Sequence, residues 1–188
     1  MKIKIFLFAT LFAFGFLSVN AQMVKTGDKV LNLGIGLGSG LGFNSYYKTT
    51  VPPISGSLEV VIKDDLFGGK GALGLGGYVG YTANKSTYTW SGGTYGWKYT
   101  NLVIGPRGYV HYGLIDKLDT YAGLMLGWWI SSNKEYGTSQ SGYNAGSWGG
   151  FYYSGFLGGR YYFTDNFAGM LELGSGLTYL NLGVAVKF

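Results

Sequence analysis

Apolar residues alternate with small or polar residues along most of the chain, and this period of two predicts β-strands with one apolar face. The segment 30–41 shows it clearly, because leucines and one isoleucine alternate there with four glycines. The C-terminal segment has an apolar row that ends on an aromatic residue, namely Leu180, Leu182, Val184, Val186 and Phe188. The residues between them are small or polar, so both segments predict strands whose two faces meet different surroundings.

Eight segments carry this alternation: 30–41, 54–63, 72–83, 99–112, 120–130, 149–163, 167–174 and 180–188. Most have the length of a tilted strand that crosses a bilayer, about ten residues. Pro52 and Pro53 precede the second segment, where a missing amide is tolerated. Short connections (64–70, 113–119 and 164–166) alternate with longer ones (43–51, 84–98 and 131–148), and a tight turn at Ser175-Gly176 is the exception. The pattern predicts an all-β fold, an eight-stranded antiparallel up-and-down transmembrane β-barrel.

Aromatic residues gather near the ends of these segments: Tyr81, Tyr99, Trp128, Trp129, Tyr153, Tyr161, Phe163 and Phe188. Tyrosine and tryptophan keep a polar atom at the headgroup level of a bilayer, so we interpret the set as interfacial girdles. Aromatic stacking on a ligand is the alternative interpretation.

Residues 1–21 have the three parts of a cleaved secretory signal peptide. Lys2 and Lys4 precede an apolar run over 5–17, and small residues end the segment at Ala21. The run is too short for a spanning helix, which needs about 17 apolar residues. We expect cleavage after Ala21, which leaves one β-barrel domain, residues 22–188, exported through the periplasm.

Charge and composition narrow the chemistry. Without Lys2 and Lys4 the net charge falls from +5 to +3, too weak to indicate a nucleic-acid partner. The chain has no cysteine and a single histidine, His111. No nucleophile can be matched to His111, and no ligand cluster for a metal is seen. We therefore expect no enzymatic activity, no metal and no cofactor.

The chain resembles the small outer-membrane β-barrels, such as the transmembrane domain of outer-membrane protein A and outer-membrane protein X. The resemblance covers the predicted mature chain and is most specific in 161–166 (YYFTDN) and in the C-terminal apolar row. That row, Leu180 to Phe188, looks like the signal that the barrel-assembly machinery recognises. The resemblance implies a monomer in the bacterial outer membrane, surrounded by lipid and lipopolysaccharide. The family contains adhesins, structural proteins, lipid-modifying enzymes and narrow channels, so it indicates location more than activity.

Four charged residues fall on the predicted inner faces, namely Glu59, Arg107, Arg160 and Glu172. Opposite charges must pair inside a barrel, and Arg160 and Glu172 lie diagonally across one predicted hairpin. We interpret the cluster as a polar plug, with a switchable gate as the alternative. Inward glycines leave space that Tyr78, Tyr109, Met125 and Trp129 would have to fill. If they do not, the barrel is a narrow channel or a transporter for small solutes or hydrophobic compounds.

The long connections 84–98 and 131–148 are rich in Tyr, Trp, Ser, Gly and Asn, a composition typical of antibody-type binding loops. They hold the candidate binding residues Tyr88, Trp90, Tyr95, Trp97, Tyr136, Tyr143 and Trp148. We predict a non-enzymatic protein with a structural and surface-interaction role, whose partner is an extracellular protein or glycan. Solvated loops without a partner are the alternative. Lys85, Lys98 and Lys134 are also placed to meet lipid phosphates as point charges.

Overall fold

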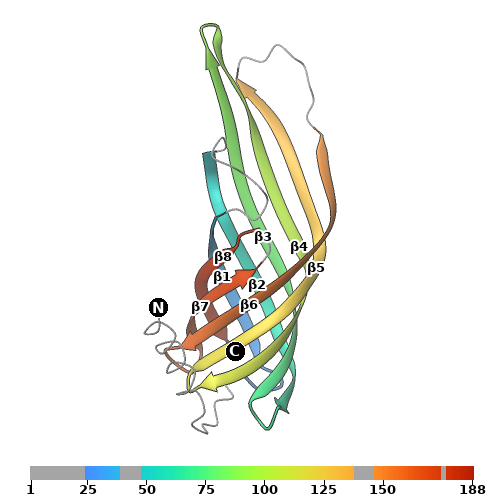
Figure 1. The fold of residues 1–188 in the computed structure, drawn as a ribbon, viewed down its shortest axis with the longest axis vertical. Coiled ribbons are helices and arrows are strands. Elements are labelled where there is room, and N and C mark those ends of the chain that lie inside the picture. The colour runs from blue at the N-terminus through green and yellow to red at the C-terminus, as the bar shows by residue number, and fades with distance from the viewer. Residues whose placement is uncertain (1–23, 39–47, 138–145, 175–176) are drawn as a thin grey trace, which may run out of the picture.

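The chain folds into one closed β-barrel. The computed structural model describes residues 24–38, 48–137, 146–174 and 177–188. The strands are β1 (Lys29–Leu37), β2 (Lys48–Leu66), β3 (Gly71–Trp90), β4 (Gly93–Ile115), β5 (Leu118–Gly137), β6 (Ser147–Tyr162), β7 (Phe167–Gly174) and β8 (Leu180–Lys187). Each strand pairs with the next one, β8 pairs with β1, and every pair is antiparallel (Figure 1). The predicted eight-stranded antiparallel barrel is confirmed, and the predicted signal peptide, 1–21, lies outside the described residues.

The outer face of the barrel is apolar. Large apolar side chains stand exposed around it, among them Leu33, Ile35, Leu58, Leu75, Ile104, Leu124, Leu126, Leu157, Leu171, Leu182, Val184 and Val186. Soluble monomers rarely expose a contiguous apolar surface of this extent. Within the described ranges, no helix has the length and apolar character that crossing a membrane requires. The outer face is suited to the hydrocarbon of a bilayer.

The aromatic girdles are only partly as predicted. Trp128, Tyr153 and Phe163 stand on the outer face with about half or more of their surface exposed. Trp129 and Tyr99 were wrongly assigned to the girdle, because their strand positions face inward. Trp129 donates its indole N–H to the buried amide oxygen of Asn101, 3.1 Å away. Inside the barrel, a tryptophan needs such a partner.

The strands differ greatly in length, which gives the barrel two unequal sides. β3, β4 and β5 have 20, 23 and 20 residues, whereas β1, β7 and β8 have 9, 8 and 8. Residues 82–90, 93–103, 129–137 and 147–155 of β3 to β6 extend past the ends of the short strands (Figure 1). We call this part the tall wall. The opposite end, where β2–β3, β4–β5 and β6–β7 connect, we call the turn end.

The segment 84–98 was predicted as a loop, and this prediction is wrong. The segment forms a hairpin in which β3 and β4 pair without interruption up to Trp90 and Gly93. Its threonines and aromatic residues have high strand propensity, and Tyr88 stacks on Tyr95 with ring centroids 5.8 Å apart. Both faces of the hairpin carry polar residues, so the apolar alternation that marks the other strands is absent here. In the same way, β5 continues to Gly137 in place of the predicted loop.

β2 also begins earlier than predicted. Pro52 and Pro53 therefore lie inside the strand and not before it. The register between β2 and β3 shifts on both sides of Val51. Such irregularities accommodate residues that have no amide to donate to the ladder.

Inward glycines provide room for large side chains from neighbouring strands. A Cβ atom at Gly34 would lie 2.7 Å from the amide nitrogen of Asn181, and one at Gly158 would lie 2.6 Å from the hydroxyl of Tyr121. Tyr121 cannot move aside easily, because its ring packs against Tyr109 and Phe156. The space that these glycines leave is therefore occupied.

We expect Gly158→Ala to destabilise the barrel by about 1–3 kcal/mol, since the new methyl group overpacks the lumen. Gly155 lies on the outer face of the same strand, where a Cβ atom would meet only Leu124 at 3.8 Å. Gly155→Ala should change stability by less than about 0.5 kcal/mol. Urea unfolding of the refolded barrels in vesicles measures both, and equal effects would contradict close packing at Gly158.

Candidate functional site: the lumen network and the tall wall

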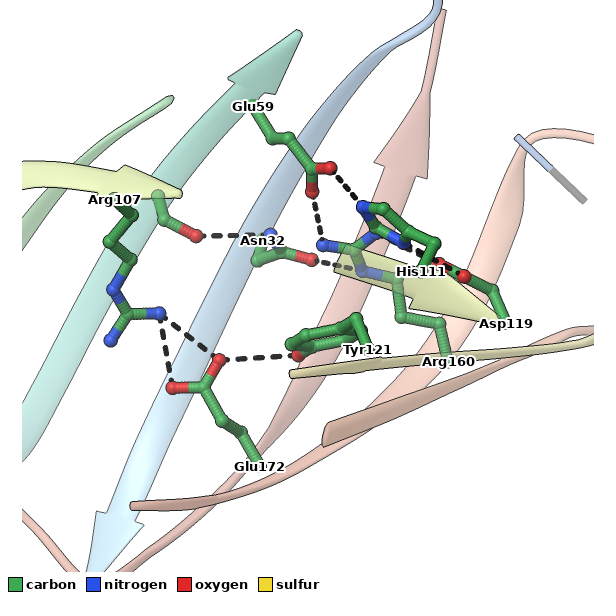
Figure 2. A network of polar contacts seen from close by, with 9 residues as sticks. Asn32, Glu59, Arg107, His111, Asp119, Tyr121, Arg160 and Glu172 are labelled. Carbon is green, nitrogen blue, oxygen red and sulfur yellow. Dashed lines mark hydrogen bonds and ion pairs between the residues drawn. The ribbon is translucent and has the colours of Figure 1, made fainter. Parts of the chain in front are cut away.

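Arg160 is the centre of a buried ionic network in the lumen. From β6 it donates to three strands, reaching Glu59 on β2 at 2.7 Å, Asp119 on β5 at 3.0 Å and Asn32 on β1 at 2.9 Å (Figure 2). Its guanidinium also lies 4.4 Å from the centre of the Tyr121 ring. The residue is completely buried. A buried charge of this kind is tolerated only when its hydrogen bonds are satisfied, as they are here.

His111 bridges the same two carboxylates. Its Nε2 lies 2.5 Å from Glu59 and its Nδ1 lies 2.9 Å from Asp119. Ionised carboxylates only accept hydrogen bonds, so the imidazolium form, which donates from both nitrogens, suits this position. Neither ring nitrogen is left to take a proton from a substrate, which argues against a general base here.

A second ion pair lies beside the first network. Arg107 on β4 donates to both oxygens of Glu172 on β7, each 3.1 Å away, and Tyr121 donates to the same carboxylate at 3.2 Å (Figure 2). The Arg107 guanidinium is enclosed by the rings of Tyr78 and Phe156, 4.0 and 4.3 Å away. These cation–π contacts add to the stability of a desolvated charge.

The four charged residues predicted to face the lumen all lie in it, but their pairing differs from the prediction. Arg160 was expected to pair with Glu172, whereas the structure pairs Arg160 with Glu59 and Arg107 with Glu172. Arg160 and Glu172 do lie diagonally across the β6–β7 hairpin, as predicted, because Gly158 stands opposite Glu172 and Met170 opposite Arg160. With His111 as imidazolium, the three cations balance the three carboxylates of the network.

Apolar side chains fill the lumen on both sides of the charged layer. One cluster, at the turn end, consists of Val24, Val30, Val61, Ala72, Tyr162, Ala168 and Ala185. The other, toward the tall wall, consists of Tyr78, Val103, Tyr109, Tyr121, Met125, Phe156 and Leu177, with Trp129 and Tyr152 packed against it. Next to Arg107 and Glu172 a cavity of about 20 Å³ remains. It has room for about one water molecule.

A larger hollow lies on the outside of the barrel. It measures about 660 Å³ and runs over β8, β1, β2 and β3, where outward Gly56 leaves a gap between Leu33 and Val79. Its lining is almost entirely apolar and faces outward. It belongs to the apolar outer face of the barrel and is no part of a path through the lumen.

The inner face of the tall wall gathers aromatic residues. Pairing places Tyr88 opposite Tyr95, and Trp148 packs edge-on against Trp129 with ring centroids 4.5 Å apart. Trp90 makes an edge contact with Tyr95 at 6.2 Å. Tyr88, Trp90 and Trp148 have about half of their surface exposed. The wall thus presents open aromatic faces above the filled lumen.

Buried amides lie among these rings. The side-chain nitrogens of Asn84 and Asn101 and the side-chain oxygen of Asn133 are buried and have no hydrogen-bond partner in the structure. Asn84 and Asn133 stand on either side of Tyr99 in one row across the sheet. Buried amide atoms normally find a partner, from the protein, water or a ligand. In the structure these three atoms are closed to solvent, so they are not part of the exposed surface of the inner face.

The candidate binding residues lie on strands and not on loops, contrary to the prediction. Tyr88, Trp90, Tyr95, Trp97 and Trp148 share the inner face of the tall wall, as their cross-strand partners show. Tyr136 is on the outer face, where its hydroxyl meets Thr87 and the carbonyl of Ser86. Tyr143 lies outside the described residues.

Sequence reasoning missed several residues of these sites. Asp119 was placed in a turn, although it is the first inward residue of β5 and pairs with Arg160. Its position one residue before the alternating apolar run could have revealed it. Leu177 lies in the connection between β7 and β8 and is buried in the lumen cluster, and no sequence signal indicates this inward position.

Within the described residues, no group of three or more His, Cys, Asp or Glu side chains is placed to hold a metal ion. Glu59, His111 and Asp119 do converge, but the Arg160 guanidinium binds both carboxylates. A cation beside it would be repelled.

No protein-family model and no curated protein matches the chain. Solved structures do. The N-terminal β-barrel domain of OprF from Pseudomonas aeruginosa is 17% identical with a TM-score of 0.52, over 87% of this chain and 98% of that domain. Ail, the attachment invasion locus protein of Yersinia pestis, crystallised with the heparin analogue sucrose octasulfate, is 14% identical with a TM-score of 0.50, over 87% and 99% of the two chains. This chain has the fold of the small eight-stranded outer-membrane β-barrels.

We expect Arg160→Met to destabilise the barrel by about 3–5 kcal/mol, because two buried carboxylates lose their cation. Lys187→Met is the matched control, since Lys187 pairs with Asp28 at 3.9 Å near the surface. Its cost should stay below about 1 kcal/mol. Urea unfolding compares the two variants.

Adding Glu59→Gln to Arg160→Met should recover part of the loss, since one uncompensated charge disappears. The network would not have the role assigned to it if Arg160→Met cost no more than Lys187→Met.

Proposed function

We propose that the protein is a non-enzymatic, monomeric β-barrel of the bacterial outer membrane that binds an extracellular glycan on the inner face of its tall wall. The observation that carries this proposal is the inner face that five aromatic candidates share, namely Tyr88, Trp90, Tyr95, Trp97 and Trp148. The outer-membrane location is supported by the apolar outer face and by the fold. In that membrane, the turn end faces the periplasm and the tall wall faces outward, as short and long connections are arranged in such barrels.

Glycan chemistry suits this face. The C–H surface of a sugar ring packs on an aromatic ring, while its hydroxyls need donors and acceptors, and the half-buried Asn133 and Glu135 lie on the same inner face. A site of this kind combines aromatic lining with a few placed polar groups. The Ail complex with sucrose octasulfate shows that a barrel of this fold can hold a sugar derivative.

The filled lumen argues against the alternative, a channel or transporter. The charged layer lies between two apolar clusters, and the cavity beside Arg107 measures only about 20 Å³. An eight-stranded barrel is just wide enough for its own side chains to fill it. The C-terminal row Leu180 to Phe188 is proposed as the signal for the barrel-assembly machinery, and most of it is exposed on the outer face.

The refolded barrel should show no steady conductance in a planar bilayer. Arg107→Ala should remain silent as well, because Tyr78, Phe156 and Leu177 still fill the lumen above the position of the lost side chain. A reproducible conductance of the folded wild type would favour the channel. An increase in Arg107→Ala alone would favour a gate.

Replacing Tyr95 and Trp97 together with alanine should weaken glycan binding at least tenfold, the effect expected when aromatic anchors are removed from a binding face. The measurement uses labelled barrel in detergent on an array of defined oligosaccharides, followed by titration of the best binder.

Tyr136→Ala is the control for this experiment, because it removes an aromatic residue from the outer face of the same wall. Its affinity should stay at the wild-type value. Equal loss in both variants, or no glycan bound by the folded wild type, would overturn the proposed function.

A further inference from the structure

Four lysines form one row across the outer face of the barrel. Lys48 stands opposite Lys85, Lys85 opposite Lys98, and Lys98 opposite Lys134, so the row crosses β2, β3, β4 and β5. Directly opposite residues have Cβ atoms about 4.5–5.5 Å apart, and like charges in such pairs repel each other. The fold therefore holds four ammonium groups in one line, and the repulsion between them is unfavourable unless a negative charge is bound.

Among the described residues, no carboxylate pairs with these lysines. In the described part of the chain, the salt bridges of Arg107, His111 and Arg160 lie in the lumen, and that of Lys187 lies at the turn end. Glu135 is the one acidic residue of the tall wall, and it stands opposite Trp97, on the inner face. A negative partner for the lysines must therefore come from outside the chain.

The row lies at a defined height above the apolar surface. The last apolar row of the outer face on β3, β4 and β5 consists of Tyr81, Leu102 and Ile130. The next row of the outer face, two residues closer to the tip of the tall wall, consists of Ala83, Thr100 and Ser132. The lysines follow, four residues beyond the apolar edge. At about 3.3 Å per residue this is about 13 Å along the strand, and about 9 Å along the membrane normal for a strand tilted by about 45°. Polar headgroups lie at about this level, and lysine side chains can extend several ångströms toward them.

We propose that the row Lys48, Lys85, Lys98 and Lys134 binds the phosphate groups of phosphorylated glycolipids in the outer leaflet. Ammonium groups bind phosphate as point charges, and juxtamembrane basic clusters are attracted to anionic lipid. The phosphates neutralise the row and fix the height and tilt of the barrel in the bilayer. This inference rests on the membrane orientation proposed above, but not on glycan binding by the tall wall.

The test compares wild type with a variant, called the wall variant, in which Lys48 and the three tall-wall lysines of the row are all replaced by glutamine. A matched control, called the turn-end control, changes the net charge equally. It replaces four lysines at the turn end with glutamine, namely Lys25, Lys29, Lys63 and Lys70. Each protein is refolded in phosphatidylcholine vesicles, with and without bisphosphorylated lipid A. Labelled lipid A that remains bound after transfer to a zwitterionic detergent gives the affinity, and urea unfolding gives the stability.

Wild type and the turn-end control should retain lipid A at least tenfold more tightly than the wall variant, since several lysine contacts with anionic lipid are lost together. Lipid A without its phosphates should be retained by none of the three. In pure phosphatidylcholine the urea midpoint of the wall variant should equal or exceed that of wild type, because the repulsion is gone. With lipid A the order should reverse.

Equal retention by wild type and the wall variant would overturn the inference, as would equal loss in both lysine variants. Stabilisation of the wild type by inorganic phosphate in pure phosphatidylcholine, to the same extent as by lipid A, would also overturn it in favour of a free anion. If the wall variant does not fold, Lys98→Gln alone must still lower retention for the inference to stand. Failure of the wild type to insert into any vesicle would contradict the membrane orientation itself.

Discussion

The buried pairing of Arg160 with Glu59 and Asp119 is the interaction on which the rest of the barrel depends. It joins β6 to β2 and β5, and the bond to Asn32 adds β1. Any missing partner would leave an ion without compensation in a site of low dielectric constant, which costs several kcal/mol. The network therefore requires a fixed register and a closed barrel. It also places buried ionic side chains across the lumen, between two apolar clusters.

Glycine makes this interior possible. Large side chains reach across the lumen only because the positions that face them are glycines without a side chain. Gly158 makes room for Tyr121 in this way, and Gly34 makes room for Asn181. In the sequence, the same glycines appeared to leave an open passage. The glycines of one strand indicate where volume is left empty, but the side chains that fill this volume come from strands far apart in the chain. That is why the sequence left the plug and the channel as alternatives.

The strands within the apolar band were predictable from sequence, because alternation against lipid is strict there. β7 was predicted with its bounds exact at both ends, 167–174. The tall wall was not predictable in this way, since both of its faces are polar or aromatic and no period of two in hydropathy marks residues 84–98. The partners of charged residues were also out of reach. Arg107 and Glu172 are 65 residues apart and meet only through closure of the ring.

The unequal strands have a consequence for the surrounding bilayer. β7 and β8 have 8 residues each. Tilted by about 45°, a strand of this length spans about 19 Å, less than the roughly 30 Å of a typical hydrocarbon core. Lipid chains beside these strands must shorten or splay, whereas those beside β4 can remain extended. In the outer membrane proposed for this protein, the barrel would thus impose a thickness gradient around its circumference, and neighbouring molecules would encounter two different lipid environments on its two sides.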